Sequence, residues 1–362
     1  MALLVRVWDG AMTMSASGTA TATALGDWGC ERGVRWETPR DVVDEAGKLV
    51  GATVGRTPHN WGRWGPADEL GTINFITRGC RRAAAKLVTE GLAVGCSIPI
   101  GEVMPVHPSR PAVVHTHLLT GSDLLAGHVP DRAAGGFFGA DDHIAMPLQS
   151  ATHWDGLSHA FHERTLYNGF WVGTVGAAGG ARRCSLHLLA GSLGGRGVLL
   201  DVARDQGLVR LPQAFAISTA MLERCADRQG VEIRTGDILL IRTGEMPWFY
   251  SLTDKSEYWT GAHPGLSAVD SIVEWVYEHE VAAIAMDNRT FEVTPFEVPG
   301  TVTYPLHSRL IRDLGLTIGE LWWLEDLAAA CAQLGRYEFM LSAPPIAVQG
   351  ASGAPTAPVA LF

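Results

Sequence analysis

The segment that decides the fold runs from Met146 to Gly169 and has the sequence MPLQSATHWDGLSHAFHERTLYNG. It carries His153, Asp155, His159 and His162 among small and apolar residues. A single buried histidine is more often a hydrogen-bonded core residue than a ligand. The cluster favours a site instead, because an imidazole and a carboxylate with a second imidazole nearby suit a metal ion beside a general base.

Simple secondary structure would not bring Gln149, His153 and Asp155 together. In a straight strand Gln149 and His153 lie about 13 Å apart, at ~3.3 Å per residue. In a helix these two stack, but Asp155 points away. The three side chains converge only if the chain bends, and residues 150–152, which are Ser-Ala-Thr, are small enough to allow it. The sequence therefore predicts a bent, buried segment that ends at Gly156.

The composition indicates a globular protein that does not bind polyanions. Of the 362 residues, 47% are hydrophobic and 18% are charged, and the net charge is -10. Binding sites for nucleic acid or an anionic membrane need clustered Lys and Arg, and the longest basic cluster found here is Arg81-Arg82. No segment reaches the ~18 uncharged apolar residues that a membrane span requires. We therefore expect binding to neither nucleic acid nor membranes.

The N-terminus and the cysteines predict a cytoplasmic location. The first residues lack the uninterrupted apolar core of a signal peptide. The six cysteines form no C-x-x-C pair and no short spacing suited to zinc. They are interpreted as reduced thiols: Cys30, Cys80, Cys96, Cys184, Cys225 and Cys331.

Patterning along the chain predicts a mixed α and β protein. Residues 1–50 look like a flexible extension, because 14–26 are small, polar and of low complexity. Residues 51–362 are expected to form a single domain. Strand-like runs occupy 93–100, 111–119, 197–203, 236–244, 281–287 and 337–348. Helical patterns cover 80–92, 266–280 and 320–335, of which the second opens with the capping-box pattern Ser267-x-x-Asp270 and the third ends at Gly335.

The stretch QSATHWDGLSH, residues 149–159, resembles the H-x-G-T-H-x-D-x-x-x-H signature of the cyclase family. This family includes bacterial kynurenine formamidase and isatin hydrolase, which are metal-dependent amide hydrolases. Further segments match in type and order and extend the resemblance over roughly residues 60–360: GDILLIRTG, HPGLS, AIAMDN, PLHSRLIRDLGLTIGELWWLEDL and APPIAVQGASGAP. The resemblance implies an α/β fold with a mixed β-sheet bent toward a barrel and helices around it.

The resemblance also implies a metal site. It makes His153 and Asp155 ligands of a divalent manganese or zinc ion, and in members with two metals His307 and Glu320 complete the site. The first histidine ligand of the family is replaced by Gln149, which offers only a neutral amide oxygen. Either Gln149 is a weaker ligand that favours manganese, or it has left the metal and hydrogen-bonds the substrate.

By the same resemblance His159 is the acid/base group. Trp154 is a candidate for the substrate pocket, because it lies between two of the implied ligands in the sequence. The implied function is hydrolysis of an amide, cyclic imide or lactone of a small molecule by metal-activated water. One alternative is a ring-forming cyclase or dehydratase of secondary metabolism. The other is a non-catalytic small-molecule-binding relative. Because oligomers are common in the family, we expect a homodimer or homotetramer.

Overall fold

The computed structural model describes residues 41–128, 137–297 and 304–362. Most of the predicted N-terminal extension, residues 1–40, lies outside these ranges. Residues 42–362 form one compact unit. Residues 42–50, which we expected in the extension, belong to this unit: Lys48 forms an isolated bridge with Phe170, and the amide of Leu49 donates to the carbonyl of Gly169 at 3.0 Å.

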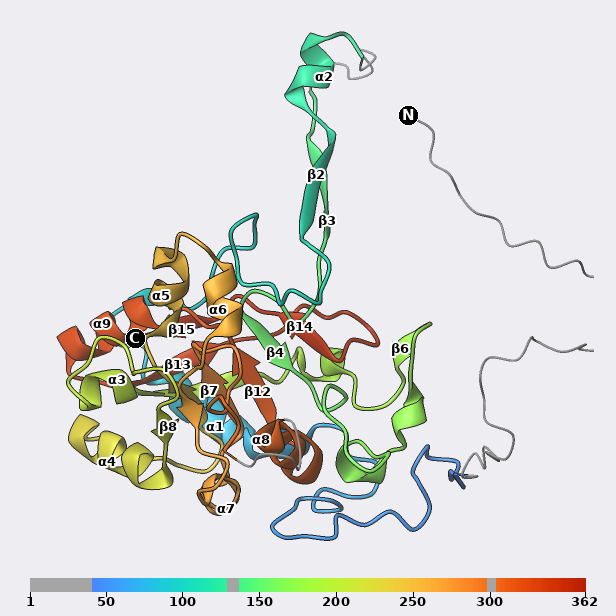
Figure 1. Ribbon diagram of the computed structural model, residues 1–362, viewed down its shortest axis with the longest axis vertical. Coiled ribbons are helices and arrows are strands. Elements are labelled where there is room, and N and C mark those ends of the chain that lie inside the picture. Colours follow the sequence, from blue (N-terminus) through green and yellow to red (C-terminus); the bar gives the residue numbers. More distant parts are fainter. Residues whose placement is uncertain (1–40, 129–136, 298–303) are drawn as a thin grey trace, which may run out of the picture. The chain divides into compact units, whose positions relative to one another are not determined.

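A nine-stranded mixed sheet is the centre of the fold, and it curls into a half-barrel with helices around it (Figure 1). This confirms the predicted α/β class. In spatial order the strands are β1 (Ala93–Gly95), β15 (Val359–Leu361), β13 (Glu338–Ser342), β7 (Gly194–Leu200), β9 (Ile238–Ile241), β11 (Ala283–Met286), β12 (Thr317–Glu320), β4 (His153–Asp155) and β14 (Gly353–Pro355). Strands β7, β9, β11 and β12 are mutually parallel, whereas the outer neighbours pair antiparallel.

The parallel strands are buried on both faces, which explains their uninterrupted apolar sequences. In β9 the side chains of Leu239 and Ile241 enter one hydrophobic core, and those of Ile238 and Leu240 enter another. The first core also contains side chains of α4 (Thr219–Gln229) and α7 (Ile272–Glu278). The second contains side chains of α9 (Glu325–Leu334). The sheet is therefore covered by helices on both sides.

Shorter helices and strands fill the connections. The remaining α-helices are α1 (Arg78–Ala85), α2 (Gly121–Leu125), α3 (Val202–Asp205), α5 (Glu245–Ser251), α6 (Ser256–Thr260) and α8 (Pro305–His307). The 3-10 helices are η1 (Gly71–Phe75), η2 (Tyr167–Gly169), η3 (Val172–Thr174) and η4 (Leu186–Leu189), and η5 (Ser308–Leu314) is a π-helix. Small two-stranded sheets pair β5 (Val175–Gly176) with β6 (Gly180–Ala181) and β8 (Ala216–Ile217) with β10 (Gly265–Leu266).

One predicted helix boundary is confirmed and another is wrong. Helix α9 ends at Gly335, whose φ of 62° is the left-handed conformation that glycine adopts without strain. Helix α7 begins at Ile272 and does not use the predicted capping box. Its two members serve other loops: the Ser267 hydroxyl donates to Glu297, and the Asp270 carboxylate accepts from the Thr219 amide. Local spacing alone did not reveal these distant partners.

The predicted strand at 111–119 is present, but outside the main sheet. Strand β2 (Val114–Leu119) pairs only with β3 (Asp141–Ala145), and the hairpin extends away from the sheet with α2 beyond β2 (Figure 1). Several of its apolar side chains are exposed, among them Leu118 at 70% and Leu125 at 90%. We call residues 112–128 and 137–145 the arm. Its apolar surface is left uncovered by the described residues of a single chain.

Two sequence expectations concern the chain as a whole. The five cysteines in the described part of the chain are free thiols, as expected, whereas Cys30 lies outside it. Within the described ranges no helix has the length and apolar character needed to cross a membrane.

Candidate metal centre

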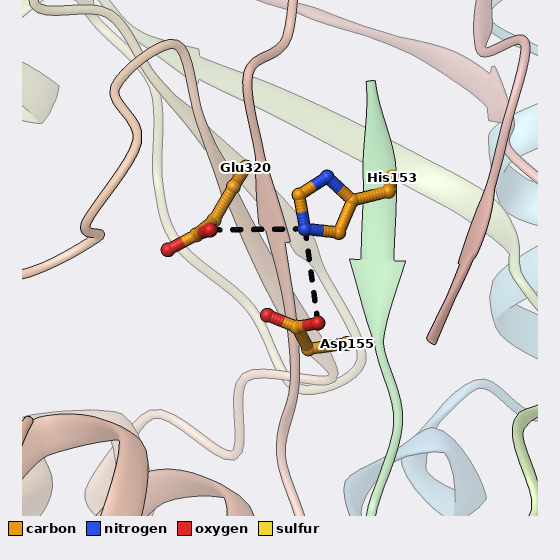
Figure 2. A group of neighbouring side chains, drawn as sticks. All are labelled: His153, Asp155 and Glu320. Atoms are coloured by element: carbon orange, nitrogen blue, oxygen red, sulfur yellow. Dashed lines mark ion pairs between the residues drawn. The ribbon is translucent and has the colours of Figure 1, made fainter. Parts of the chain in front are cut away.

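Three side chains converge where β4 pairs with β12, one strand in from the β14 edge of the sheet (Figure 2). His153 and Asp155 are two residues apart on β4 and so share one face, and Glu320 is the direct partner of His153 across the ladder. The Nε2 atom of His153 lies 3.7 Å from Asp155 Oδ1 and 3.7 Å from Glu320 Oε2. All three side chains are nearly excluded from solvent. Residues 165 positions apart in the sequence thus form one group.

The predicted bend precedes this group. Ala151 has a φ of 54°, in the left-handed region that residues with a Cβ rarely adopt, and it is buried. The bend brings the Ala151 carbonyl within 2.9 Å of His153 Nδ1. Because a carbonyl only accepts hydrogen bonds, the ring proton of neutral His153 lies on Nδ1. Its Nε2 lone pair therefore faces the two carboxylates.

The site therefore brings hydrogen-bond acceptors together without a donor between them. His153 Nε2, Asp155 Oδ1 and Glu320 Oε1 are buried, and none has a hydrogen-bond partner within the described residues. Buried polar atoms of this kind are rare and costly. One candidate ligand atom from each of the three residues lies within 4.8 Å of the others. Two ligands bonded at about 2.1 Å to a tetrahedral ion lie about 3.4 Å apart, so this group fits a divalent cation.

His307 joins the group through Glu320. Its Nε2 lies 3.4 Å from Glu320 Oε1, and its Nδ1 lies 2.6 Å from Oε2 of the fully buried Glu292. Burial disfavours the charged imidazole, but Glu292 and Glu320 together raise the pKa of His307 well above its usual value. A carboxylate on the second nitrogen is the usual way to orient a metal-binding histidine. Glu292 escaped the sequence analysis, although a lone acid between Phe291 and Val293 was a usable signal.

His159 lies beside the group and contacts Gln149. Its Nε2 is 3.6 Å from Asp155 Oδ1, and its Nδ1 is 3.4 Å from the amide nitrogen of Gln149, which also lies 3.1 Å from Ser352 Oγ. Burial lowers the pKa of His159, against the opposing attraction of Asp155. The imidazole is therefore neutral near pH 7 and available to accept a proton. Gln149 contacts this base rather than His153.

Trp154 is not in the substrate pocket, contrary to our expectation. It points to the opposite face of β4, is fully buried against Trp322, and donates its indole N–H to the Ala343 carbonyl at 2.8 Å. The reason is the alternation of side chains along a strand. When His153 and Asp155 face the site, the residue between them must face the core.

The group lies at the wall of a pocket of about 230 Å³. His153, His159, His307 and Glu320 contribute to its wall. Further wall residues come from loops and from α6, and the sequence analysis missed them: Arg110, Trp259, Arg289 and Tyr304. No pattern around these positions distinguishes them from surface residues, since only the fold brings them together. The arrangement offers metal ligands, a neutral base and aromatic walls in one small cavity.

Comparison with known proteins agrees with this geometry. The family model described as putative cyclase matches residues 94–293, more than half of the chain. The crystal structure of a protein described as a novel cyclase is 39% identical, with a TM-score of 0.78, and the match covers 84% of this chain and 97% of that one. No curated protein matches the sequence.

More distant structures share the fold alone. Isatin hydrolase A from Ralstonia solanacearum is 17% identical, with a TM-score of 0.54, and the match covers 77% of this chain and 95% of that one. An isatin hydrolase bound to the product analogue thioisatinate is also 17% identical, with a TM-score of 0.53 and coverage of 78% and 96%. The resemblance inferred from the motif is confirmed, and the chain belongs to the cyclase family.

Proposed function

We propose that this protein is a metal-dependent hydrolase that cleaves an amide, cyclic imide or lactone bond of a small molecule. The observation that carries the proposal is the convergence at a pocket of about 230 Å³ of three buried ligand atoms, from His153, Asp155 and Glu320, that have no hydrogen-bond partner among the described residues. A divalent ion bound there would act as a Lewis acid: it would bring the pKa of water toward about 7 and polarise a carbonyl oxygen.

The residues of the chain supply the proton transfers. His159 accepts a proton at Nε2, the nitrogen that faces Asp155, and returns it to the leaving nitrogen or oxygen. For Nε2 to act as a base, Nδ1 must carry the ring proton. Turning the terminal amide of Gln149 presents its oxygen to that proton, and the same oxygen can then accept from the Ser352 hydroxyl. In this turned orientation Gln149 would hold His159 in the base form.

The ligand set supports manganese or zinc as the ion. His153 offers one imidazole, which both ions accept, whereas Asp155 and Glu320 offer the carboxylate oxygens that manganese prefers. Two carboxylates also balance the charge of one divalent ion. His307, held by Glu292, and the neighbouring Glu320 would provide ligands for a second ion, as the family resemblance implies.

Two other functions give different experimental results. A ring-forming cyclase or dehydratase would release water, whereas hydrolysis incorporates oxygen from the solvent into the product. A non-catalytic binding relative would bind small molecules without turnover. The simultaneous presence of His153, His159 and Glu320 in one pocket favours an enzyme over a binding relative.

The deciding experiment is turnover of a panel of amides, imides and lactones by metal-loaded protein in ¹⁸O-labelled water. We expect label in the product, loss of turnover after exhaustive chelation, and recovery with Mn²⁺ or Zn²⁺. The His159→Ala variant should keep its metal and lose about 10²- to 10⁴-fold in turnover. Undiminished turnover in metal-free protein would refute the proposal, and unlabelled cyclised product would favour the cyclase alternative.

We further propose a cytoplasmic homodimer or homotetramer. The free thiols of the described cysteines support a reducing compartment. The uncovered apolar side chains of the arm support contact with another copy of the chain.

A further inference from the structure

Two arginine side chains line the same pocket as the metal-binding group. Arg289 follows strand β11, and Arg110 precedes strand β2. Among the described residues no carboxylate forms an ion pair with either guanidinium. Arg110 donates to the backbone carbonyl of Gln149, whereas Arg289 donates to a side chain. Unpaired guanidinium groups in a pocket wall are unusual enough to need a chemical reason.

Arg289 is held by a chain of buried hydrogen bonds. Its Nε donates to His263 Nε2 at 2.6 Å, and His263 Nδ1 lies 2.7 Å from Glu245 Oε1. Because a guanidinium only donates, His263 Nε2 must be unprotonated, so Nδ1 carries the proton and donates to Glu245. Both His263 and Glu245 are fully buried. The chain fixes the guanidinium through Nε alone.

The two Nη groups of Arg289 remain available. Neither has a hydrogen-bond partner within the described residues, although Arg289 lines the pocket. Parallel N–H groups of this kind match the two oxygens of a carboxylate and form charge-assisted bonds with it. The Trp259 ring lies 5.3 Å from the guanidinium carbon and leaves a flat apolar surface beside it.

The charged groups around the pocket leave the positive charge of Arg289 without a negative partner among the described residues. A divalent ion would be balanced by the carboxylates of Asp155 and Glu320. Burial raises the pKa of Glu245 and so favours its uncharged form, which leaves the charge of Arg289 uncompensated. The pKa of His107, at the same pocket, is lowered by burial and by the charges of Arg110 and Arg289.

We propose that Arg289 binds a carboxylate of the substrate, so that the protein acts on small carboxylic acids whose scissile carbonyl lies at the group of His153, Asp155 and Glu320. This assignment rests on the proposed function and names its substrate class. His263 is a positioning residue that acts through Arg289. The aromatic walls formed by Trp259 and Tyr304 fit a flat acid, such as one with an aromatic ring.

The test compares benzoate with benzamide, which have the same shape and differ in charge. Calorimetric titration of manganese-loaded protein should show benzoate binding about 10- to 100-fold more tightly, as expected for charge-assisted hydrogen bonds. Arg289→Gln should remove most of this preference, because benzoate affinity should fall much further than benzamide affinity. Arg289→Lys should keep part of it. The matched control is Arg210→Gln, since Arg210 stacks on Trp248 outside the pocket wall and should leave the preference intact.

Three measurements make the outcome decisive. Chelator-treated wild type should keep the preference for benzoate, and chelator-treated Arg289→Gln should lose it, which separates Arg289 from the metal as the anion site. His263→Leu should weaken benzoate binding, and His263→Gln, whose amide can both accept from Arg289 and donate to Glu245, should restore it. Thermal unfolding of each variant reports whether the fold is intact.

Equal binding of the two probes by the wild type, or an unchanged preference in Arg289→Gln, would overturn the assignment. These outcomes are independent of metal-dependent turnover. Failure of the carboxylate assignment therefore leaves the hydrolase proposal standing, and failure of turnover leaves the binding result standing.

Discussion

Glu320 stands directly opposite His153 in the antiparallel ladder of β12 and β4, and Oε2 of the one lies 3.7 Å from Nε2 of the other. Because backbone pairing fixes this approach, we predict that Glu320→Gln keeps the fold and loses metal. The amide removes one negative charge from the ligand set, so the metal affinity should fall at least about 10-fold, or ~1.4 kcal/mol. Titration of metal-free protein with Mn²⁺ measures it. Glu278→Gln, on the exposed surface of α7, is the control.

Gln149 is the position where this chain departs from the family signature. Its side chain contacts His159 and Ser352 and packs against Gly353, where a Cβ would meet it at 2.7 Å. We therefore predict that Gln149→His leaves metal affinity within about 2-fold and lowers turnover, because His159 loses the amide that orients it. Metal titrations and kinetics with wild type and variant decide this. Tighter zinc binding by the variant would instead make position 149 a ligand position.

Ala151 is predicted to tolerate glycine but not valine. At a φ of 54° glycine relieves about 1–2 kcal/mol of strain, which offsets a lost methyl contact and the greater freedom of the unfolded chain. Ala151→Gly should therefore change the free energy of unfolding by less than about 1 kcal/mol. Ala151→Val adds a branched Cβ and extra volume in a buried, left-handed position, and should cost about 3 kcal/mol. Denaturant unfolding curves measure both; equal effects would contradict the strain argument.

His263 is predicted to make stability fall in mild acid. Burial, together with the charges of Arg289 and Arg210, lowers its pKa from 6.5 to about 3. Between these values the unfolded chain binds a proton that the folded protein does not. The free energy of unfolding should therefore decrease as the pH falls from about 6.5 toward 3, by up to ~1.4 kcal/mol per pH unit.

The His263→Gln variant isolates this contribution, because Glu245, Tyr258, Arg210 and Arg289 still face the position. Denaturant unfolding at pH 7, 6 and 5 should give a flatter dependence for the variant below pH 6.5 and parallel curves above pH 7. The same slope in both proteins at pH 5–6 would show that His263 does not titrate as described.

The arm is predicted to hold copies of the chain together. A two-stranded hairpin is marginally stable alone in water, and the arm exposes Leu118 and Leu125 without cover in one chain. Replacing residues 112–145 by a short Gly-Ser linker should convert the oligomer to a monomer and leave the main sheet folded, since neither β2 nor β3 pairs with it. Light scattering gives the mass, and circular dichroism checks the fold. A wild type that is monomeric over a wide concentration range would contradict the prediction.

The sequence predicted the parts of the fold that are encoded locally. Buried strands such as β9 and β11 appear as apolar runs, and the end of α9 is marked by Gly335. Two of the candidate metal ligands, His153 and Asp155, lie in one short motif, so they could be identified from the sequence. Their approach to Glu320 depends on the register of two strands far apart in the chain, which no local pattern specifies.

The rest of the site could not be predicted because it comes from loops. Arg110 and Arg289 have ordinary surface surroundings in the sequence and meet only in the folded pocket. Trp154 is a different case. Alternation along a strand already placed it on the face opposite His153 and Asp155, so its position in the core followed from the motif itself.

Side chains on opposite faces of β4 serve different purposes, so substitutions that change the chemistry of the site and substitutions that change stability fall at different positions. Position 154 belongs to the packed core with Trp322, so changes there are selected for folding. Positions 153 and 155 lie on the other face of the strand, toward the metal-binding group, and His153 lines the pocket. Relatives with different ions or different reactions could therefore diverge at alternate positions of one strand and keep the same scaffold. A designer who randomises only positions 153, 155 and 320 would leave the hydrophobic core intact.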